Sequence, residues 1–317
     1  MIAKATAPGK IILFGEHAVV YGRPAIAVPM SQVRATAVVE TGAQEGIRLI
    51  APDLGQDAML NETDLDDPIA AVIEQFRQSA ELEHLPHLQV TVTSQIPIAS
   101  GLGSGAAITA AVIRALAQFM QLDALIEDEA VSRLTYEVEK LHHGTPSGID
   151  NTVVSYERPV YFVRQQPQNR IEPFAVAWPL TFLVADTGVR SSTKIAVGDV
   201  RQAWQADTAT FEHLFNECGR LTDAARVAIE RGHLAEIGAL MQENHTILQQ
   251  MTVSSPELDH LVYHAMQAGA LGAKLSGAGR GGNMIALIEP EMEMAVSAAL
   301  TRAGAKSILK TTLQPTK

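Results

Sequence analysis

The 317-residue sequence predicts an α+β fold, because strand and helix patterns mix along it without regular alternation. Strand patterns dominate the first hundred residues, and helical periodicity fills most of the chain beyond residue 180. The composition is 47% hydrophobic and 19% charged, which is enough for a substantial core in one large domain or two smaller ones. We place a boundary near residue 180, which gives domains 1–180 and 181–317.

The first domain begins with strand patterns and continues into helices. Residues 2–20 predict a strand, a Pro-Gly turn and a second strand. Residues 87–96 alternate apolar and polar side chains, as a half-buried strand does. Apolar residues spaced by four then predict a helix from Ser104 to about Leu122, and a second helix is expected at about 127–142.

The second domain is expected to be largely helical. Three prolines in residues 161–179 predict a loop, and residues 180–188 predict a strand. The elements expected after that strand are helices at 196–232, 233–250 and 256–268, a strand, glycine loop and strand at 273–289, and a last helix near 291–303. Cys218 lies in an apolar stripe of the first of these helices, so we interpret it as a core residue.

Charge and cysteine content narrow the possible partners and compartment. A net charge of −11 disfavours a surface that binds nucleic acid or anionic lipid. One cysteine permits no internal disulfide, which indicates a reducing compartment. No leader-like segment opens the chain, and no apolar run reaches the about 20 residues that cross a bilayer. The sequence therefore predicts a cytoplasmic protein that binds neither nucleic acid nor a membrane.

A glycine-rich segment, residues 96–107 (IPIASGLGSGAA), leaves a strand and enters a helix. Such a loop aims unpaired backbone N–H groups and the positive end of the helix dipole at one point, which suits a phosphate group. Ser104 can add a hydroxyl to the phosphate or to a metal ion. The alternative is a tight turn with a serine cap. No lysine follows the last glycine, so a standard P-loop is disfavoured.

A second glycine cluster, residues 277–282 (GAGRGG), fits the G-x-G-x-x-G string of dinucleotide-binding proteins. That fingerprint must open a helix, whereas the following residues continue as a strand, so a nicotinamide oxidoreductase is disfavoured. The loop can cover a ligand or be a plain hairpin turn. Arg280 can contact phosphate or simply be solvated.

Two carboxylates and a lysine are candidates for phosphoryl-transfer chemistry. Glu139 falls near a helix end and Asp150 follows a Gly-Thr-Pro-Ser-Gly bend, so one can hold a cation while the other takes a proton. The alternatives are a surface helix charge for Glu139 and an Asx-turn for Asp150. Lys10 can face Asp150 and lower the pKa of a reacting hydroxyl, or it can begin a strand with its head in water.

Five segments in order, residues 7–22, 97–107, 143–151, 186–194 and 274–287, resemble the successive signatures of the GHMP kinases. The resemblance spans nearly the whole chain. It implies a two-lobed fold with a ribosomal-S5-like N-terminal half and a ferredoxin-like C-terminal half. It also implies ATP-dependent phosphorylation of a small alcohol. DTGVRSSTK and HGTPSGIDN favour the 5-hydroxyl of mevalonate, which would give 5-phosphomevalonate for isoprenoid synthesis.

The resemblance also implies roles for individual residues. Asp150 matches the catalytic base and Lys10 the lysine beside it, Glu139 matches a Mg²⁺ ligand, and Ser104 is a second candidate ligand. His17 and Glu16 match the substrate pocket, and Thr193 a residue that supports it. The expected cradle for the ATP phosphates consists of Pro97, Ser100, Gly101, Leu102, Gly103, Ser104, Gly105 and Ala106.

Two departures from the family pattern leave alternatives open. Gly105 stands where the family usually has a second serine that is associated with magnesium, and Arg280 stands where glycine is common. The rival functions are another GHMP kinase acting on homoserine, phosphomevalonate or a sugar, and a kinase-like binding protein that has lost catalysis. The resemblance further suggests a homodimer.

Overall fold

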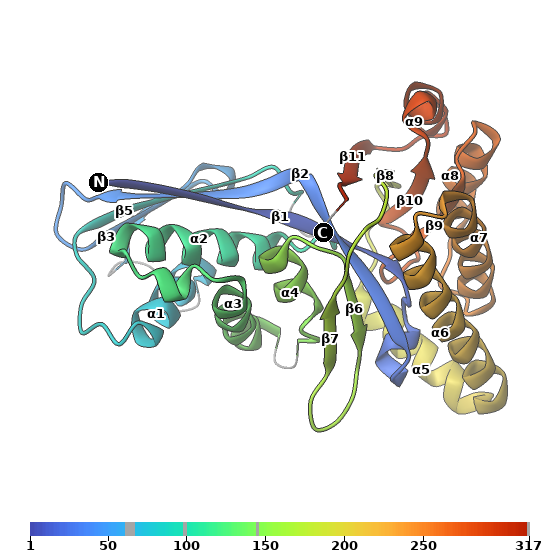
Figure 1. Cartoon of the computed structure of the whole chain (residues 1–317), viewed down its shortest axis with the longest axis horizontal. Coiled ribbons are helices and arrows are strands. Elements are labelled where there is room, and N and C mark those ends of the chain that lie inside the picture. The colour runs from blue at the N-terminus through green and yellow to red at the C-terminus, as the bar shows by residue number, and fades with distance from the viewer. Residues whose placement is uncertain (61–66, 98–99, 144–145, 316–317) are drawn as a thin grey trace. The chain divides into compact units, whose positions relative to one another are not determined.

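The computed structural model describes residues 1–60, 67–97, 100–143 and 146–315 (Figure 1). The chain forms two compact units. Unit 1 consists of Met1–Lys10 and Val33–Glu157, and unit 2 consists of Ile11–Gln32 and Arg158–Lys317. Strands β1 (Ile2–Phe14) and β2 (Pro24–Thr41) contribute residues to both units. None of the helices in the described ranges is long and apolar enough to span a membrane.

Unit 1 is a sheet with helices on one side. Its strands run in the order β4-β3-β5-β2, and β1 pairs with β2. Strand β3 pairs antiparallel with β4, and β2 pairs antiparallel with β5, whereas β3 and β5 are parallel. Figure 1 shows α1 to α4 on the same side of these strands. The bounds are β3 (Ile47–Ala51), β4 (Gln56–Met59), β5 (Leu88–Ser94), α1 (Pro68–Ser79), α2 (Ser104–Met120), α3 (Asp128–His143) and α4 (Ile149–Tyr156), with short 3₁₀ turns η2 (Pro52–Leu54) and η4 (Asp123–Leu125).

Helix α2 is the central helix of unit 1, and its composition explains its burial. Ten of its residues are buried, six of them alanines. Small side chains let α2 approach β5, α3 and α4 closely, which its contacts with all three confirm. The predicted helices at 104–122 and 127–142 and the predicted strand at 87–96 are confirmed, with ends shifted by at most two residues.

Unit 2 contains two groups of strands. The first residues of β2 pair with β6 (Val160–Val163), and β6 pairs with β7 (Arg170–Pro173). A separate antiparallel sheet has the order β11-β8-β10-β9. Its bounds are β8 (Leu180–Asp186), β9 (Gly272–Ser276), β10 (Asn283–Ile288) and β11 (Ser307–Leu313).

The helices of unit 2 cover the second sheet. They are α5 (Thr193–Ala206), α6 (Thr208–Arg231), α7 (Leu234–Gln250), α8 (Pro256–Gln267) and α9 (Glu293–Arg302), and the 3₁₀ turns are η1 (Ala18–Tyr21) and η5 (Pro290–Met292). Helix α7 packs on β9, and α8 packs on β9 and β10. Cys218 of α6 is fully buried in the core, as expected. The α+β class is thus confirmed.

Three local expectations were wrong. Pro8 and Gly9 do not turn the chain, because β1 continues through them and proline, which lacks an N–H group, is tolerated in strands at a sheet edge. The predicted loop at 161–179 contains strands of the β6–β7 hairpin, with Pro167 in the connection, and only residues 164–169 and 174–179 of it lie outside strands. The single helix expected at 196–232 is two helices divided at Asp207, whose side chain accepts a hydrogen bond from the Thr210 N–H.

Helix α1 and strand β11 are among the elements that were not anticipated from the sequence. Helix α1 begins at Pro68 after Asp67, whose carboxylate caps the N–H groups of Ile69 and Ala70. Strand β11 pairs along the whole length of β8. An aspartate followed by proline and spaced apolar residues was an available signal for α1. Strand β11 alternates only weakly and depends on its partner.

Candidate active site

Lys10 and Asp150 form an ion pair in unit 1, as the sequence predicted. Nζ of Lys10 lies 3.1 Å from Oδ2 of Asp150. The Lys10 side chain is 11% exposed and that of Asp150 is 30% exposed. The ammonium is therefore held against the carboxylate, while the carboxylate still has an open side from which another molecule can approach.

Two packed helices hold Asp150 in place. Asp150 lies in the first turn of α4, which follows Gly148 at φ 89°, a backbone conformation that favours glycine. The next residue, Asn151, is buried, and its amide donates to the carbonyl and hydroxyl oxygens of Ser132 at 3.1 and 2.9 Å. These bonds fix α4 to α3. Gly144 and Thr145 of the predicted HGTPSGIDN motif lie outside the described residues.

The glycine loop reaches the same place from the other direction. Lys10 N–H donates to the Leu102 carbonyl at 2.8 Å, and Gly103, at φ 72°, precedes the first residue of α2. A Cβ atom on Gly103 would lie 2.7 Å from Cγ of Lys10, so a larger residue would displace that lysine. The N-terminus of α2, with its unpaired N–H groups and positive dipole end, therefore lies beside the Lys10–Asp150 pair.

The remaining cradle residues are only partly described. Ile98 and Ala99, within the predicted phosphate loop, lie outside the described residues. The Ser100 hydroxyl donates to the Pro97 carbonyl at 2.6 Å, which closes the loop on itself. A Cβ atom on Gly105 would meet nothing within 4 Å, so this position faces open space at the start of α2.

Glu139 belongs to the same cluster. It lies on α3, and burial raises the pKa of its carboxyl to about 8, with a further increase from the charge of Asp150 and a decrease from that of Lys10. A carboxyl group with this pKa is mostly protonated at pH 7 in the free protein. A cation bound beside it would reverse that preference, because the cation would favour the carboxylate.

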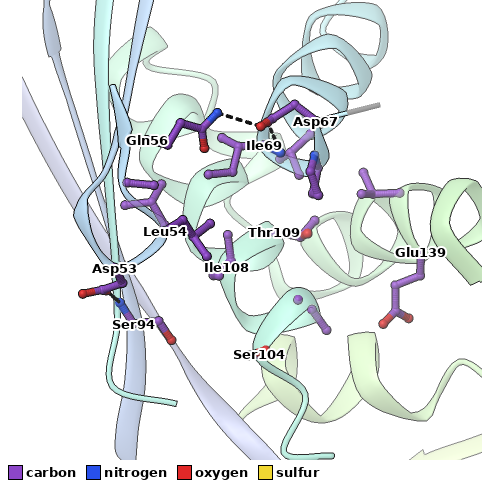
Figure 2. A pocket seen from close by; sticks show the side chains of 17 residues that line it. Asp53, Leu54, Gln56, Asp67, Ile69, Ser94, Ser104, Ile108, Thr109 and Glu139 are labelled. Carbon is purple, nitrogen blue, oxygen red and sulfur yellow. Dashed lines mark hydrogen bonds between the residues drawn. The ribbon is translucent and has the colours of Figure 1, made fainter. Parts of the chain in front are cut away.

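A pocket in unit 1 adjoins this cluster. It has a volume of about 200 Å³ and is lined mostly by apolar groups from η2, α1, β5, α2 and α3. Figure 2 shows Ser104 and Glu139 at one end of the pocket and Gln56 and Asp67 at the other. The Gln56 amide donates to Asp67 at 2.6 Å. The pocket thus extends from the N-terminus of α2 into an apolar compartment.

A second lysine–carboxylate pair lies in unit 2. Glu16 and Lys274 form a short ion pair, and both side chains are at most 1% exposed. Lys274 also donates to the Leu275 carbonyl at 2.7 Å. Burial raises the pKa of Glu16 and lowers that of Lys274, and in both cases the partner's charge opposes the shift. Glu16, predicted to contact substrate, has its carboxylate sealed in this pair.

His17 and Thr193, the other predicted substrate residues, also belong to unit 2. His17 is 5% exposed, and its Nε2 lies 2.9 Å from the Ala278 carbonyl oxygen. Its backbone φ of 59° is unusual for a residue with a side chain. Thr193 is exposed at the first position of α5, directly after the capping residue Ser192.

The second glycine cluster connects β9 to β10, which are antiparallel neighbours. No helix follows it, so the prediction against a dinucleotide fingerprint is confirmed. Arg280 contacts other protein groups. Its guanidinium pairs with Asp199 of α5, and its backbone N–H donates to the Val253 carbonyl at 2.7 Å. The predicted alternative of a merely solvated arginine is therefore wrong.

The described residues contain no group of three or more histidine, cysteine, aspartate or glutamate side chains placed to hold a metal ion. The two predicted Mg²⁺ ligands, Ser104 and Glu139, both line the pocket of Figure 2.

Family models match both parts of the chain. The model described as the GHMP kinases N terminal domain matches residues 68–158, and the one described as GHMP kinases C terminal matches residues 225–306. The chain belongs to the GHMP kinase family. The first model ends just after α4, so it includes α2, Glu139 and Asp150, and the resemblance inferred from the five motifs is confirmed.

Similar proteins span almost the whole of this GHMP kinase. A mevalonate kinase of Thermococcus sibiricus is 37% identical over 324 residues, covering 96% of this chain and 94% of the relative. One of Pyrococcus horikoshii is 36% identical over 319 residues, covering 95% and 92%. Because identity extends over both units, the likeness is not confined to the short glycine motifs.

Solved structures agree. The crystal structure of L. major mevalonate kinase in complex with R-mevalonate has a TM-score of 0.87 and 31% identity, and covers 99% of this chain and 96% of that one. The crystal structure of Methanococcus jannaschii mevalonate kinase has a TM-score of 0.83 and 27% identity, with 100% and 98% covered. The two-lobed GHMP kinase fold is thereby confirmed, and the chain is a kinase.

Sequence reasoning missed two features of the site. Lys274 lies in the last of the five motifs, but the sequence analysis assigned it no role. A lysine inside a strand of otherwise uncharged residues is a signal for a buried partner. The pocket walls were also missed, because η2, α1 and β5 are far apart in sequence and none of their apolar residues differs from an ordinary core residue.

Proposed function

We propose that this GHMP kinase transfers the γ-phosphoryl group of ATP to the 5-hydroxyl of mevalonate, giving 5-phosphomevalonate for isoprenoid synthesis. The observation that carries the proposal is the Lys10–Asp150 pair, 3.1 Å apart beside the N-terminus of α2. The relatives named above support the choice of mevalonate, since they are named as mevalonate kinases and one solved structure contains R-mevalonate.

Each member of the pair has a distinct task in a direct, in-line transfer. Asp150 accepts the proton of the 5-hydroxyl, and its open side leaves room for the alcohol. Lys10 stabilises the negative charge that develops on the alcohol oxygen as this proton leaves. The N–H groups at the start of α2 and the positive end of its dipole hold the phosphates. This division follows from phosphoryl transfer, in which positioning and charge stabilisation provide most of the catalysis.

The pocket beside α2 suits the nucleoside of ATP. Its walls are mostly apolar, as those of base-binding pockets are. One end of the pocket is formed by Ser104 and Gly105 at the N-terminus of α2. We assign the cradle 97–106 to the phosphates and this pocket to adenosine. The same placement leaves Lys10 and Asp150 next to the outer phosphates.

Mg²⁺ fits the donor set of this cluster. Glu139 offers a carboxylate and Ser104 a hydroxyl, both on the pocket wall, and Mg²⁺ commonly takes few protein ligands together with phosphate oxygens and water. When bound, the ion neutralises the phosphate oxygens. The chain's own part is to supply Glu139 in its ionised form and to keep Ser104 at the start of α2.

The substrate residues of unit 2 take different parts in the proposal. His17 contacts mevalonate, and Thr193 supports the site from the start of α5. The carboxylate of Glu16 is sealed in its pair with Lys274, so we assign it to holding the adjacent His17 rather than to contact with substrate.

We further propose a cytoplasmic homodimer. Light scattering coupled to size exclusion tests the oligomeric state, and twice the monomer mass is the expected result. A mass equal to one chain would contradict the dimer without affecting the assignment of activity.

A substrate screen tests the function. Purified protein is incubated with ATP, Mg²⁺ and either mevalonate, homoserine, galactose or phosphomevalonate, and ADP release is measured. We expect turnover with mevalonate alone. Turnover of homoserine, galactose or phosphomevalonate instead would make the chain a different GHMP kinase, and ATP binding without any product would favour a non-catalytic binding protein.

A further inference from the structure

Arg114 is the only charged residue of α2, and its side chain is 11% exposed. The rest of the helix is uncharged, and ten of its residues are buried. A charge in such surroundings needs partners, because burying an unpaired guanidinium is costly. Helices α2, α3 and α4 pack on one another in unit 1 (Figure 1), and the partners of Arg114 lie on the other two helices.

The first partner fixes the beginning of α3. Nη2 of Arg114 lies 2.7 Å from Oδ1 of Asp128, the first residue of α3. A carboxylate at a helix N-terminus is stabilised by the positive end of the helix dipole. Asp128 therefore interacts favourably with its own helix and with the guanidinium at once, and it ties the start of α3 to the middle of α2.

The second partner fixes the end of α4. The same Nη2 donates to the carbonyl oxygen of Ser155, the second-last residue of this helix. The last carbonyl groups of a helix have no partner within it, and a cation is favourable at that end. Ser155 is 0% exposed, so solvent does not compete for this carbonyl. Arg114 thus caps α4 from a different helix.

Helix α4 needs this support because it is short. It has eight residues, and isolated helices of fewer than about 12 residues are marginal in water. Near its other end, Asn151 bonds it to α3 through Ser132. Asp150 lies in the first turn of α4, so the position of its carboxylate follows the position of the helix.

The same three helices carry the groups that the proposed function assigns to unit 1. The N-terminus of α2 faces the phosphates, α3 carries Glu139 and α4 carries Asp150. Arg114 extends from α2 and bonds both of the other helices. One guanidinium therefore joins the elements that hold the phosphate loop, the candidate metal ligand and the candidate base.

Resting on the proposed function, we propose that Arg114 is a positioning residue for phosphoryl transfer. It is not among the residues that line the pocket. Its guanidinium sets the position of α4 against α2, and with it the distance from the Asp150 carboxylate to the phosphoryl group at the start of α2. An error of about 1 Å in such a distance can cost on the order of 100-fold in rate.

Arg114→Met tests the proposal, because methionine fills much of the same space without a charge or a donor. We expect kcat for mevalonate to fall about 10- to 100-fold. KM for ATP and for mevalonate should stay within about threefold of the wild type, because the groups that bind them are unchanged. The assays are run well below the thermal midpoint of the variant. A wild-type kcat, or a loss confined to KM, would overturn the proposal.

A double-variant cycle shows whether Arg114 acts through Asp150. In the Asp150→Asn background, Arg114→Met should lower the residual transfer rate by less than about threefold, because the group that Arg114 positions is already absent. Single-turnover transfer from γ-labelled ATP measures these slow rates. The fall in thermal midpoint should be the same in both backgrounds. An equal fold-loss of transfer in both backgrounds would overturn the proposal, because Arg114 would then act independently of Asp150.

Arg114→Lys provides the same test if the methionine variant does not fold. Lysine keeps the charge, but its shorter side chain has one ammonium group in place of the planar, forked guanidinium. We expect kcat to fall about 3- to 30-fold, and this loss should again shrink in the Asp150→Asn background. A kcat equal to that of the wild type would overturn the proposal.

Arg77 provides a matched control in the same unit. Its guanidinium also pairs with a carboxylate, that of Glu74 at 2.7 Å, and donates to a backbone carbonyl, that of Leu82 at 2.7 Å. These partners lie on α1 or just after it. Arg77→Met should lower the thermal midpoint and leave kcat as in the wild type. An equal loss of kcat in the Arg77 and Arg114 variants would overturn the proposal, because a general loosening of unit 1 would explain both.

The proposed function and the role of Arg114 fail in different ways. Failure of the wild type to phosphorylate mevalonate would overturn the proposed function. Normal turnover by the wild type together with an unchanged kcat in Arg114→Met would overturn only the role of Arg114.

Discussion

Two lysine–carboxylate pairs each include one residue near the start of the chain, Lys10 in the first pair and Glu16 in the second. The two pairs differ in burial. In the pair of Lys10 with Asp150 the side chains are 11% and 30% exposed. In the pair of Lys274 with Glu16 they are 0% and 1% exposed. Both join the same chemical groups. The first is open to an incoming molecule, and the second is closed.

Burial decides what each pair can do. A partly solvated pair contributes little to stability, about 1 kcal/mol or less, so its groups are free to exchange a partner for a substrate. In a sealed pair, loss of either partner leaves an unpaired charge in the interior, which is strongly destabilising. The same charged groups are therefore available to a substrate in unit 1 and fix local geometry in unit 2.

The largest effect is expected from breaking the open pair. Asp150→Asn removes the proposed proton acceptor while keeping the shape of the side chain. We expect kcat to fall roughly 10³- to 10⁴-fold, with a thermal midpoint near that of the wild type. Initial rates of ADP release and a thermal melt measure the two quantities. Full turnover by this variant would show that Asp150 is not the base.

Breaking the sealed pair should affect stability first. Lys274→Met leaves the Glu16 carboxylate buried without its partner, and we expect the free energy of unfolding to fall by about 3–5 kcal/mol in urea denaturation. The double variant Glu16→Gln/Lys274→Met should recover most of this loss. Lys10→Met is the matched control, with an expected loss of about 1 kcal/mol because Asp150 remains partly solvated. Similar losses of unfolding free energy in Lys274→Met and Lys10→Met would show that the two ion pairs do not differ in their contribution to stability.

The raised pKa of Glu139, which lies beside the open pair, makes the stability of the protein depend on pH. Its pKa is raised from 4.5 to about 8 in the folded protein, so the folded state binds more protons than the unfolded state between these values. The resulting stabilisation is complete below pH 4.5 and is lost as pH rises to 8. Glu139→Gln lacks this dependence. Without Mg²⁺, its unfolding free energy relative to wild type should rise by about 1–2 kcal/mol from pH 5 to 8, after allowance for solvent screening.

Urea denaturation at pH 5, 6, 7 and 8 measures this difference for the two proteins. A constant difference across the series would mean that Glu139 is ionised in the folded state throughout. The open cluster would then contain two charged carboxylates around one ammonium group.

The smallest effect concerns Gly105. A Cβ atom at this position would meet nothing within 4 Å, so Gly105→Ser fits without displacing a neighbour and should add about 0.5 kcal/mol to helix stability. If the new hydroxyl reaches the metal, the Mg²⁺ concentration for half-maximal activity should fall about two- to tenfold. Gly105→Ala is the matched control, because it adds to helix stability without a hydroxyl. Identical Mg²⁺ dependence of the two variants would remove this position from the metal site.

Much of the fold was predictable because its signals are local. The alanine-rich spacing of α2, the alternation of β5 and the glycines that permit positive φ at 101 and 103 depend on neighbouring residues alone. The hairpin of β6 and β7 was not predictable in this way. Its prolines read as loop signals, and its strands exist because β6 finds a partner in β2, more than a hundred residues earlier.

The candidate site was likewise predictable only in part. Residue types and motif order indicated Lys10, Asp150, Glu139 and the glycine loop, and the predicted proximity of Lys10 to Asp150 is confirmed. The same reasoning assigned Glu16 to substrate contact and left Lys274 without a role. Neither the exposure of a carboxylate nor the identity of its partner is written in the residues beside it.

The sequence by itself determined the kinase family, the helix that begins at the glycine loop and the chemical groups available for phosphoryl transfer. Only the tertiary structure decided which lysine stays open and which is sealed. The physical reason is that backbone preferences act between near neighbours in the chain, whereas desolvation and ion pairing depend on distances through space.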